Sequence, residues 1–234
     1  LNQAPVFVDL KKSAFQTKTD FLTLKEGERT RVTIANFNLQ RNRIHYIDGL
    51  GKVKCNSQYA DFSSWAYPTV KCNCCTFTDK EGKEIKAKSR LLVPVLEYPV
   101  NKLDGKTVTG SEVKLKMWDM NVMEEKSLMS ILEEYSNGDN LMSADVTTFD
   151  LSLSKNKNGD FAIITLVPAP SWRSKFQASI NTELAKINND FYTTAFKESA
   201  KTVSSESIQN VLNQKQDSMI MAQQLMNQQI PTMN

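Results

Sequence analysis

The segment KCNCC at residues 71–75 contains three of the four cysteines in a chain that has a single histidine. That histidine, His45, and the fourth cysteine, Cys55, lie in the segment IHYIDGLGKVKC at residues 44–55. The spacing is His45-x9-Cys55-x16-Cys72-x2-Cys75, with Cys74 additional. A Cys-x2-Cys pair supplies two sulfur ligands from one tight turn, and structural zinc takes four Cys and His ligands tetrahedrally. The pattern predicts one structural zinc ion bound by His45, Cys55, Cys72 and Cys75.

The same residues allow other interpretations. In one, the thiols are buried core residues beside an incidental histidine; in another, Cys74 replaces Cys72 or Cys75 as a ligand. A Cys–His nucleophile would need an activating arrangement, and the sequence offers only proximity. A closed set of four protein ligands leaves no position for a catalytic water. We therefore expect a structural metal that contributes to folding, and no enzymatic activity.

Aromatic and basic residues crowd around this metal pattern. Cationic side chains follow the phosphates of a single-stranded nucleic acid, and exposed rings stack on its bases without reading their identity. The alternative is a small core over the metal, for which Phe62 and Phe77 are the best candidates. We predict a nucleic-acid interface made of Arg41, Arg43, Tyr46, Lys54, Tyr59, Trp65, Tyr67, Lys71, Lys86, Lys88 and Arg90.

The composition is that of an ordinary globular chain: 234 residues, 40% hydrophobic and 24% charged. It contains no run of about 18 apolar residues that would span a membrane. No secretory signal is recognisable, so we expect a reducing compartment in which cysteines bind metals. Residues 1–100 hold 16 Lys and Arg against 10 Asp and Glu, whereas residues 101–234 hold 13 against 16. The first part is the better candidate for binding an anion, although scattered solvated charge would also explain the difference.

The middle of the chain has the pattern of short strands. Asp104-Gly105 and Asn158-Gly159 are hairpin signals between such segments. Five strands joined in this way suit a small closed or partly open barrel. The strand segments are residues 29–39, 90–100, 107–118, 147–155 and 161–169.

One helix is expected between these strands, at residues 121–138. Asn121 and Glu124 form a capping-box pattern at its start, and Gly138 is suited to end it. A strand–helix–strand order inside a barrel is typical of the oligonucleotide/oligosaccharide-binding (OB) fold. The expected apolar stripe of this helix is Leu128, Ile131, Leu132 and Tyr135.

The predicted fold class is α+β, with a β-rich OB-like barrel at residues 28–170 and a zinc-binding flap inserted at about residues 43–80. Residues 1–27 are expected to form an N-terminal arm, and residues 171–234 a helical C-terminal region. The end of that region is rich in Met and Gln. It either packs on its own domain or docks a partner, since Met side chains adapt to varied surfaces.

The order of these features resembles the single-stranded DNA-binding proteins of T-even phages, which have an OB fold with a zinc subdomain between early strands. The resemblance covers about residues 27–170. The matching segments are GERTRVTI (27–34), His45 with GKVKC (51–55), Cys72-x2-Cys75, KAKSRLLVPVL (86–96), KMW (116–118) and FDLSLSKN (149–156).

The resemblance implies that His45, Cys55, Cys72 and Cys75 are the zinc ligands and that Lys86, Lys88 and Arg90 belong to the DNA-binding strand. It implies sequence-independent binding and protection of single-stranded DNA during phage replication, recombination and repair, in the cytoplasm of a bacterial host. Cooperative self-association on DNA and contacts with replication or recombination proteins through the C-terminal helices would accompany this function.

The chain departs from the family at several points. Leu91 and Leu92 follow Arg90 where the family has aromatic residues, and residues 225–234 contain no acidic block. The spacing between the second and third ligands is longer, and the basic N-terminal motif has only LKKSA (10–14) as a counterpart. The alternative function is a zinc-containing adaptor or transcription-associated protein that acts through protein–protein contacts.

Overall fold

The computed structural model describes residues 18–47, 49–61, 63, 67–76, 84–136, 143–158, 161–204, 206–211, 213–214 and 221. The elements, in chain order, are β1 (Arg29–Ile34), β2 (Gln40–Ile47), β3 (Gly51–Lys54), β4 (Gln58–Tyr59), β5 (Pro68–Val70), the 3-10 turn η1 (Asn73–Thr76), β6 (Lys88–Glu97), β7 (Lys114–Met120), α2 (Val122–Glu134), β8 (Phe149–Asn158), β9 (Phe161–Pro170), α3 (Arg173–Leu184) and α4 (Asn189–Glu198).

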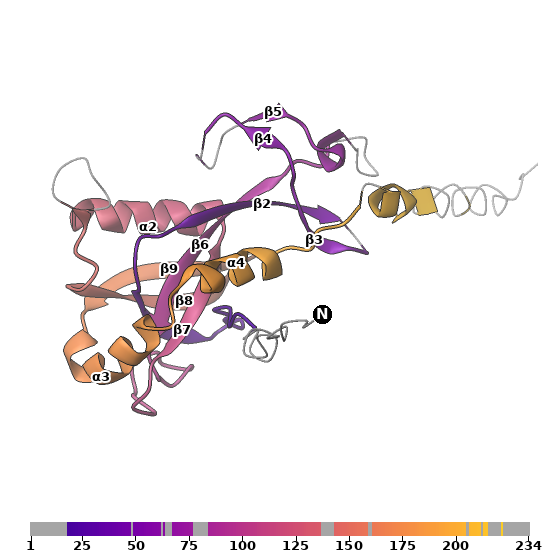
Figure 1. Cartoon of the computed structure of the whole chain (residues 1–234). Coiled ribbons are helices and arrows are strands. Elements are labelled where there is room, and N and C mark those ends of the chain that lie inside the picture. Colours follow the sequence, from indigo (N-terminus) through magenta and orange to yellow (C-terminus); the bar gives the residue numbers. More distant parts are fainter. Residues whose placement is uncertain are drawn as a thin grey trace, which may run out of the picture.

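The long strand β6 is the centre of the main sheet, which is antiparallel throughout (Figure 1). One edge of β6 pairs with β2 through residues 88–92 and with β1 through residues 95–97. Its other edge pairs with β7 through residues 91–97. The strand order is therefore β3-β2-β6-β1-β8-β9, with β7 beside β6. Strands β4 and β5 form a separate two-stranded sheet above β2 (Figure 1).

The expected mixture of antiparallel strands and helices is present, but a closed barrel is not confirmed. Within the described parts of the chain, β7 and β9 do not pair, so the sheet stays open. The free edge of β7 bonds instead to an N-terminal segment: the Leu22 N–H donates to the Met117 carbonyl, and the Met117 N–H donates to the Asp20 carbonyl, both at 2.9 Å. Residues 20–22 thus occupy backbone hydrogen-bonding groups of β7. A strand that closed the barrel would have to bond to the same groups.

The described part of the predicted N-terminal arm packs into the fold. Leu22 and Leu24 are 8% and 5% exposed and belong to the main core cluster, together with residues of β1, β6 and β8. The Lys155 ammonium donates to the Leu24 carbonyl at 2.8 Å. Thr19, Leu22 and Leu24 are therefore buried in the fold while most of residues 18–27 stay exposed, and residues 1–17 lie outside the described residues.

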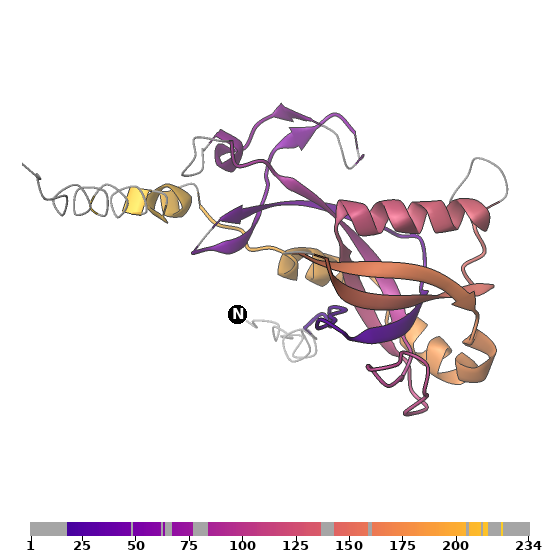
Figure 2. The ribbon, with the colours of Figure 1, turned by 180° about the vertical axis from the view of Figure 1, so that it is seen from behind.

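Helix α2 lies across one end of the curved sheet, beside the β8–β9 hairpin (Figure 2). Its capping box is confirmed: the Asn121 side chain accepts from the Glu124 N–H at 3.0 Å, and the Glu124 carboxylate accepts from the Asn121 N–H at 3.1 Å. Leu128, Ile131 and Leu132 of the predicted apolar stripe are buried in the main core, whereas its fourth member, Tyr135, is 36% exposed. The helix ends at Glu134, and the expected terminator Gly138 is outside the described residues.

A second apolar cluster joins α3 to the sheet, and a buried ion pair between Arg31 and Asp150 lies beside it. Arg31 Nε donates to Asp150 Oδ2 at 2.9 Å, and the Arg31 guanidinium lies 3.8 Å from the Trp172 ring centroid. The fully buried Asp150 carboxylate also accepts from the Tyr98 hydroxyl at 3.0 Å and from the Trp172 N–H at 2.8 Å. Burial is the main cause of the raised pKa of Asp150. This carboxylate ties β1, β8 and the start of α3 together.

The described residues contain no helix with the length and apolar character needed to cross a bilayer.

Replacing Asp150 with Ala should lower the free energy of unfolding by about 3–5 kcal/mol, because it leaves the Arg31 charge buried without its partner. Asp150→Asn keeps the shape of the side chain and should cost less. Urea unfolding of both variants measures the two losses. A loss below about 1 kcal/mol for Asp150→Ala would show that this carboxylate does not hold α3 in place.

Candidate metal centre and its basic surround

The four predicted ligands converge on one point although they come from three segments. Antiparallel pairing of β2 with β3 places His45 opposite Val53, and the Cys55 N–H extends this ladder by donating to the Arg43 carbonyl at 2.7 Å. Cys72 and Cys75 flank a tight turn, closed by a bond of 2.9 Å from the Cys75 N–H to the Cys72 carbonyl. The hairpin and the turn each supply two ligands, as the spacing indicates.

The distances between the ligand atoms describe a compact cluster. The three Sγ atoms of Cys55, Cys72 and Cys75 lie 3.6–3.8 Å apart. His45 Nε2 lies 3.4 Å from Cys72 Sγ and 3.6 Å from Cys75 Sγ. All four atoms fall within 4.8 Å of one another. A cluster of three thiols and one imidazole at this spacing can hold a metal ion.

The surroundings orient the ligands as metal sites require. His45 is fully buried, and its Nδ1 lies 3.0 Å from the Ile85 carbonyl, a contact in which Nδ1–H donates and Nε2 is left for a metal. The Ser57 hydroxyl accepts from the Cys72 N–H at 2.8 Å and lies 3.2 Å from both Cys55 Sγ and Cys75 Sγ. Ser57 is a site residue that the sequence pattern missed, since a serine two residues after Cys55 carries no signal.

Of the three candidate ligand thiols, Cys75 resists ionisation when no cation is present, whereas the pKa values of Cys55 and Cys72 are lowered. Burial, followed by the nearby Cys55 charge, raises the pKa of Cys75 to about 12. Burial also opposes ionisation of Cys55, but hydrogen bonds with Ser57 and Tyr59 outweigh it and lower the pKa of Cys55. A bound cation would favour the thiolate form of all three sulfurs and release protons on binding.

Cys74 is not one of the four clustered candidate ligands, and it has a packing role. It is 5% exposed and lies in an apolar cluster with Ile47, Val53 and Ile208. Ile208 belongs to the C-terminal segment, whose Lys201 pairs with the edge of β3: the Lys54 N–H donates to the Lys201 carbonyl at 2.8 Å. Cys74 therefore anchors the metal turn to the β2–β3 hairpin and to the C-terminal region, which favours Cys72 and Cys75 as the ligands.

The predicted nucleic-acid residues of β2 are divided between the two faces of the sheet. Directly paired residues of neighbouring strands project to the same face, and successive residues alternate. Arg41, Arg43 and His45 share one face with the metal. Ile44 and Tyr46 share the other face with their partners on β6 and β3, namely Lys88, Lys54 and Lys52. The face that carries Ile44 and Tyr46 is here called the α4 face, because the Lys54 ammonium lies 4.0 Å from the ring centroid of Phe196 on α4.

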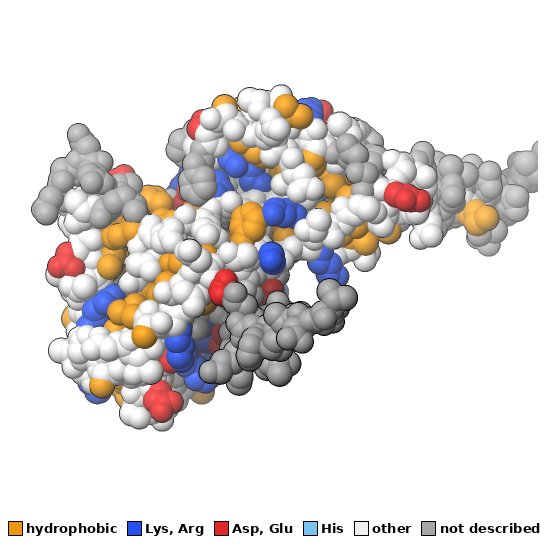
Figure 3. Space-filling model, viewed as in Figure 1, with side chains coloured by type: hydrophobic (Ala, Val, Ile, Leu, Met, Phe, Trp, Pro, Cys, Tyr) orange, Lys and Arg blue, Asp and Glu red, His pale blue; other side chains and the backbone are white. Residues whose placement is uncertain are grey.

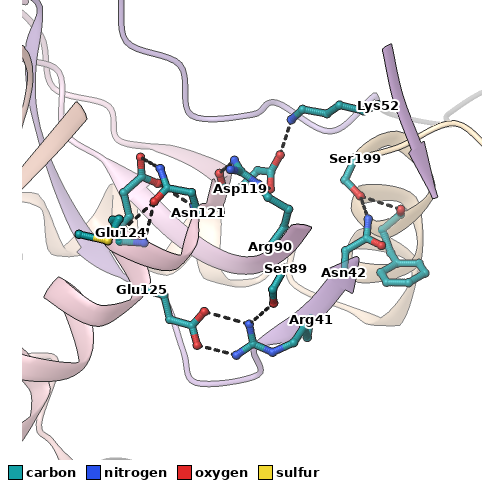
Figure 4. A network of polar contacts seen from close by, with 12 residues as sticks. Arg41, Asn42, Lys52, Ser89, Arg90, Asp119, Asn121, Glu124, Glu125 and Ser199 are labelled. Atoms are coloured by element: carbon teal, nitrogen blue, oxygen red, sulfur yellow. Dashed lines mark hydrogen bonds and ion pairs between the residues drawn. The ribbon is translucent and has the colours of Figure 1, made fainter. Parts of the chain in front are cut away.

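Two of the predicted phosphate-binding arginines are already engaged in ion pairs (Figure 4). Arg41 donates to both carboxylate oxygens of Glu125 on α2, at 2.5 and 2.9 Å, and its side chain is 5% exposed. Arg90 Nε donates to Asp119 Oδ1 at 2.7 Å. Sequence reasoning missed both carboxylates, which lie 84 and 29 residues away from their arginines.

Arg43 and Tyr59 form a stacked pair that supports the segment between β3 and β6. From here on, the name flap is used for this segment alone (residues 55–87), because residues 44–47 and 51–54 of the flap expected from the sequence pair within the main sheet. The Arg43 guanidinium lies 3.6 Å from the Tyr59 ring centroid and donates to the Ser63 carbonyl at 2.7 Å. The Tyr59 hydroxyl is 3.5 Å from Cys55 Sγ. This pair braces the flap over β2 and the metal ligands, which is a different arrangement from a ring open to stacking.

The exposed members of the predicted interface lie at the root of the flap and on its sheet. Tyr46 is 45% exposed, with the Lys88 ammonium 5.1 Å from its ring centroid. Tyr67, beside β5, is 86% exposed. Lys86 is exposed, and exposed Lys71 pairs with Glu84 at 2.9 Å. Trp65, Phe62 and Phe77 lie outside the described residues.

The surface view agrees with this distribution. Figure 3 shows Lys and Arg side chains gathered between the flap and α4, over the region of β2 and β3. Hydrophobic side chains lie among them. The chain thus presents cations and exposed rings beside the candidate metal centre.

Replacing Cys55 with Ser should weaken metal binding by at least about 100-fold, since even partners outside the ligand shell contribute about 10–100-fold. Cys74→Ala is the matched control and should still bind one metal ion per chain, because its side chain faces the apolar cluster. Competition titration against a colorimetric chelator measures both affinities. Equal losses in the two variants would show that the ligand assignment is wrong.

Comparison with protein-family models, curated proteins and solved structures found no match to this chain.

Proposed function

We propose that this chain is a sequence-independent single-stranded DNA-binding protein, with an OB-type core and a flap braced by one structural zinc ion. The observation that carries the proposal is the pair of Tyr46 and Lys88 at the root of the flap. A ring that is 45% exposed lies beside an exposed ammonium group, with Lys86 nearby in the chain. This combination is suited to stacking a base while neutralising its phosphate.

The strand connectivity supports an OB-type core. Strands β1, β6 and β7 pair in order, α2 follows β7, and the β8–β9 hairpin returns to lie beside β1. A five-stranded, partly open Greek-key barrel has this order. The flap then occupies the connection between its first two barrel strands, and its exposed residues lie beside the core strand β6.

The ligand distances favour zinc as the metal. Zinc binds thiolate sulfur at about 2.3 Å and imidazole nitrogen at about 2.0–2.1 Å. A regular tetrahedron with these bonds has edges of about 3.8 Å between sulfurs and about 3.6 Å between sulfur and nitrogen. The five edges given above are 3.4–3.8 Å long. A closed Cys3His set is typical of structural zinc, and we propose no catalytic activity.

The biological setting proposed here follows the resemblance to the T-even phage proteins. The chain would bind and protect single-stranded DNA during replication, recombination and repair in the host cytoplasm. Replication or recombination proteins would be contacted through the C-terminal region, and neighbouring copies could bind the strand cooperatively.

Removing the metal should weaken DNA binding while leaving the main sheet folded, because the flap has little core of its own. We expect a chelator to accelerate proteolysis within residues 55–76 and to lower the affinity for oligo(dT). Atomic emission on the untreated protein should find one zinc ion per chain. Unchanged cleavage of the flap after full metal removal would contradict the bracing role.

Tyr46→Ala should weaken oligo(dT) binding by about 1–3 kcal/mol, the usual contribution of one stacked base. Tyr46→Phe keeps the ring and should bind nearly as well as the natural chain.

Lys88→Gln should reduce the dependence of affinity on salt by about 0.7 in the logarithmic slope. Lys106→Gln, which removes an exposed charge from the β6–β7 connection, is the charge-matched control and should change neither quantity.

Fluorescence titrations with single-stranded and duplex oligonucleotides across a salt series test these expectations. Equal affinity for duplex and single strands, or affinity independent of salt, would overturn the proposed function.

A further inference from the structure

A hollow of about 410 Å³ is lined in part by Lys52, Arg90 and Asp119 of the α4 face, and the proposed function assigns no role to it. Residues 21–24 form one wall, and β6, β7, β8 and α4 also contribute to the lining. Its charged lining residues are Lys52, Arg90, Lys155, Asp119 and Glu198. Cations therefore outnumber carboxylates in this hollow, and two of the cations, Lys52 and Arg90, lie on the sheet face that carries Tyr46.

The carboxylate of Asp119 holds two of these cations together (Figure 4). Asp119 Oδ2 accepts from Lys52 Nζ at 2.6 Å, and Asp119 Oδ1 accepts from Arg90 Nε at 2.7 Å. Arg90 Nη2 also donates to the Asp119 backbone carbonyl. The Lys52 side chain is 39% exposed, whereas those of Arg90 and Asp119 are 16% and 12% exposed. Solvent reaches this group of charges mainly through Lys52.

The strand register connects this group to the exposed ring. Lys52 pairs directly with Tyr46 across β2 and β3, so the two side chains lie on the same face. Arg90 is two residues from Lys88 on β6 and projects to that face as well. A polynucleotide stacked on Tyr46 therefore has a cationic hollow within reach of its neighbouring phosphates.

We propose that this hollow is a phosphate subsite of the single-strand interface, and that the Asp119 carboxylate occupies it in the free protein in place of a backbone phosphate. The inference rests on the proposed DNA-binding function. Arginine binds carboxylate and phosphate through the same geometry, so one anion can replace the other. The Lys52–Asp119 pair, whose lysine side chain is 39% exposed, contributes little to stability and is screened by salt, which allows Lys52 to exchange its partner.

The remaining charges of the hollow are compatible with an incoming phosphate. The Lys155 ammonium donates to a backbone carbonyl, which leaves its positive charge unneutralised by that contact. The Glu198 carboxylate accepts from the Thr19 N–H at 2.7 Å, so it is held at the wall. A phosphate would face three cations and two carboxylates, Glu198 and Asp119, so the lining keeps a net charge of +1 when Lys52 and Arg90 turn from Asp119 to the phosphate.

Asp119→Asn tests the proposal directly, because it removes the competing charge while its amide oxygen can still accept from Arg90. We expect the affinity for oligo(dT) to rise roughly two- to fivefold at about 0.1 M salt. The logarithmic salt slope should steepen by about 0.7, the value for one additional phosphate contact on a single strand. The same fluorescence titration measures both quantities.

Two further variants separate this effect from a change in overall charge. Glu134→Gln changes the net charge by the same amount at an exposed position near the end of α2, and it should leave affinity and slope unchanged. Lys52→Gln should lower the affinity and make the slope shallower by about 0.7. In the double variant Asp119→Asn/Lys52→Gln, the Asp119→Asn change should raise the affinity for oligo(dT) by less than it does alone. The reason is that Lys52, one of the two cations that Asp119 binds, is missing.

The results distinguish a failure of the phosphate subsite from a failure of the proposed DNA-binding function. If the natural chain binds oligo(dT) but a folded Asp119→Asn variant binds equally or more weakly, the subsite is wrong and the proposed function stands. If the natural chain shows no salt-dependent binding of single strands, the proposed function itself fails. Thermal unfolding of Asp119→Asn shows whether the variant is folded, and the effect of Lys52→Gln alone decides the question if it is not.

Discussion

The convergence of one imidazole and three thiols is the interaction on which the flap depends. The flap contributes only short strands, β4 and β5, and the described buried residues of this segment are Cys55, Cys74 and Cys75. Segments of this kind cannot offset the entropy of ordering the chain by apolar burial alone. Ligand bonds to a cation would supply what the core does not, because the free energy of metal binding is also free energy of folding.

Two further contacts transmit this local order to the rest of the molecule. The β2–β3 hairpin carries His45 and leads into Cys55, so the ligand set is continuous with the main sheet. Cys74 packs against Ile208, and Lys201 bonds to the edge of β3, which joins the C-terminal segment to the same hairpin. The position of the flap over the sheet is therefore determined by the metal ligands on one side and by apolar packing on the other.

The basic residues of this region fall into two groups with different tasks. Arg41 and Arg43 hold secondary structure in place, through Glu125 on α2 and through the flap backbone at Ser63. Lys86 and Lys88 remain exposed beside Tyr46. Ammonium groups on long flexible stems suit a mobile phosphate backbone, whereas guanidinium groups suit fixed bidentate contacts. A cluster of basic residues in a sequence thus overstates the number of cations that a ligand can meet.

The cluster of His45, Cys55, Cys72 and Cys75, the capping box of α2 and the antiparallel hairpins could be predicted from the sequence, because each depends on residues close together or on a rare residue type. The sequence did not show that Leu22 and Leu24 enter the core, or that Asp119 and Glu125 would neutralise Arg90 and Arg41. Strand alternation places neighbouring basic side chains on opposite faces of the sheet. The acidic residues that pair with them there come from distant segments of the chain. Which cations stay exposed is visible only in the folded chain, because exposure depends on contacts between segments that the chain order does not reveal.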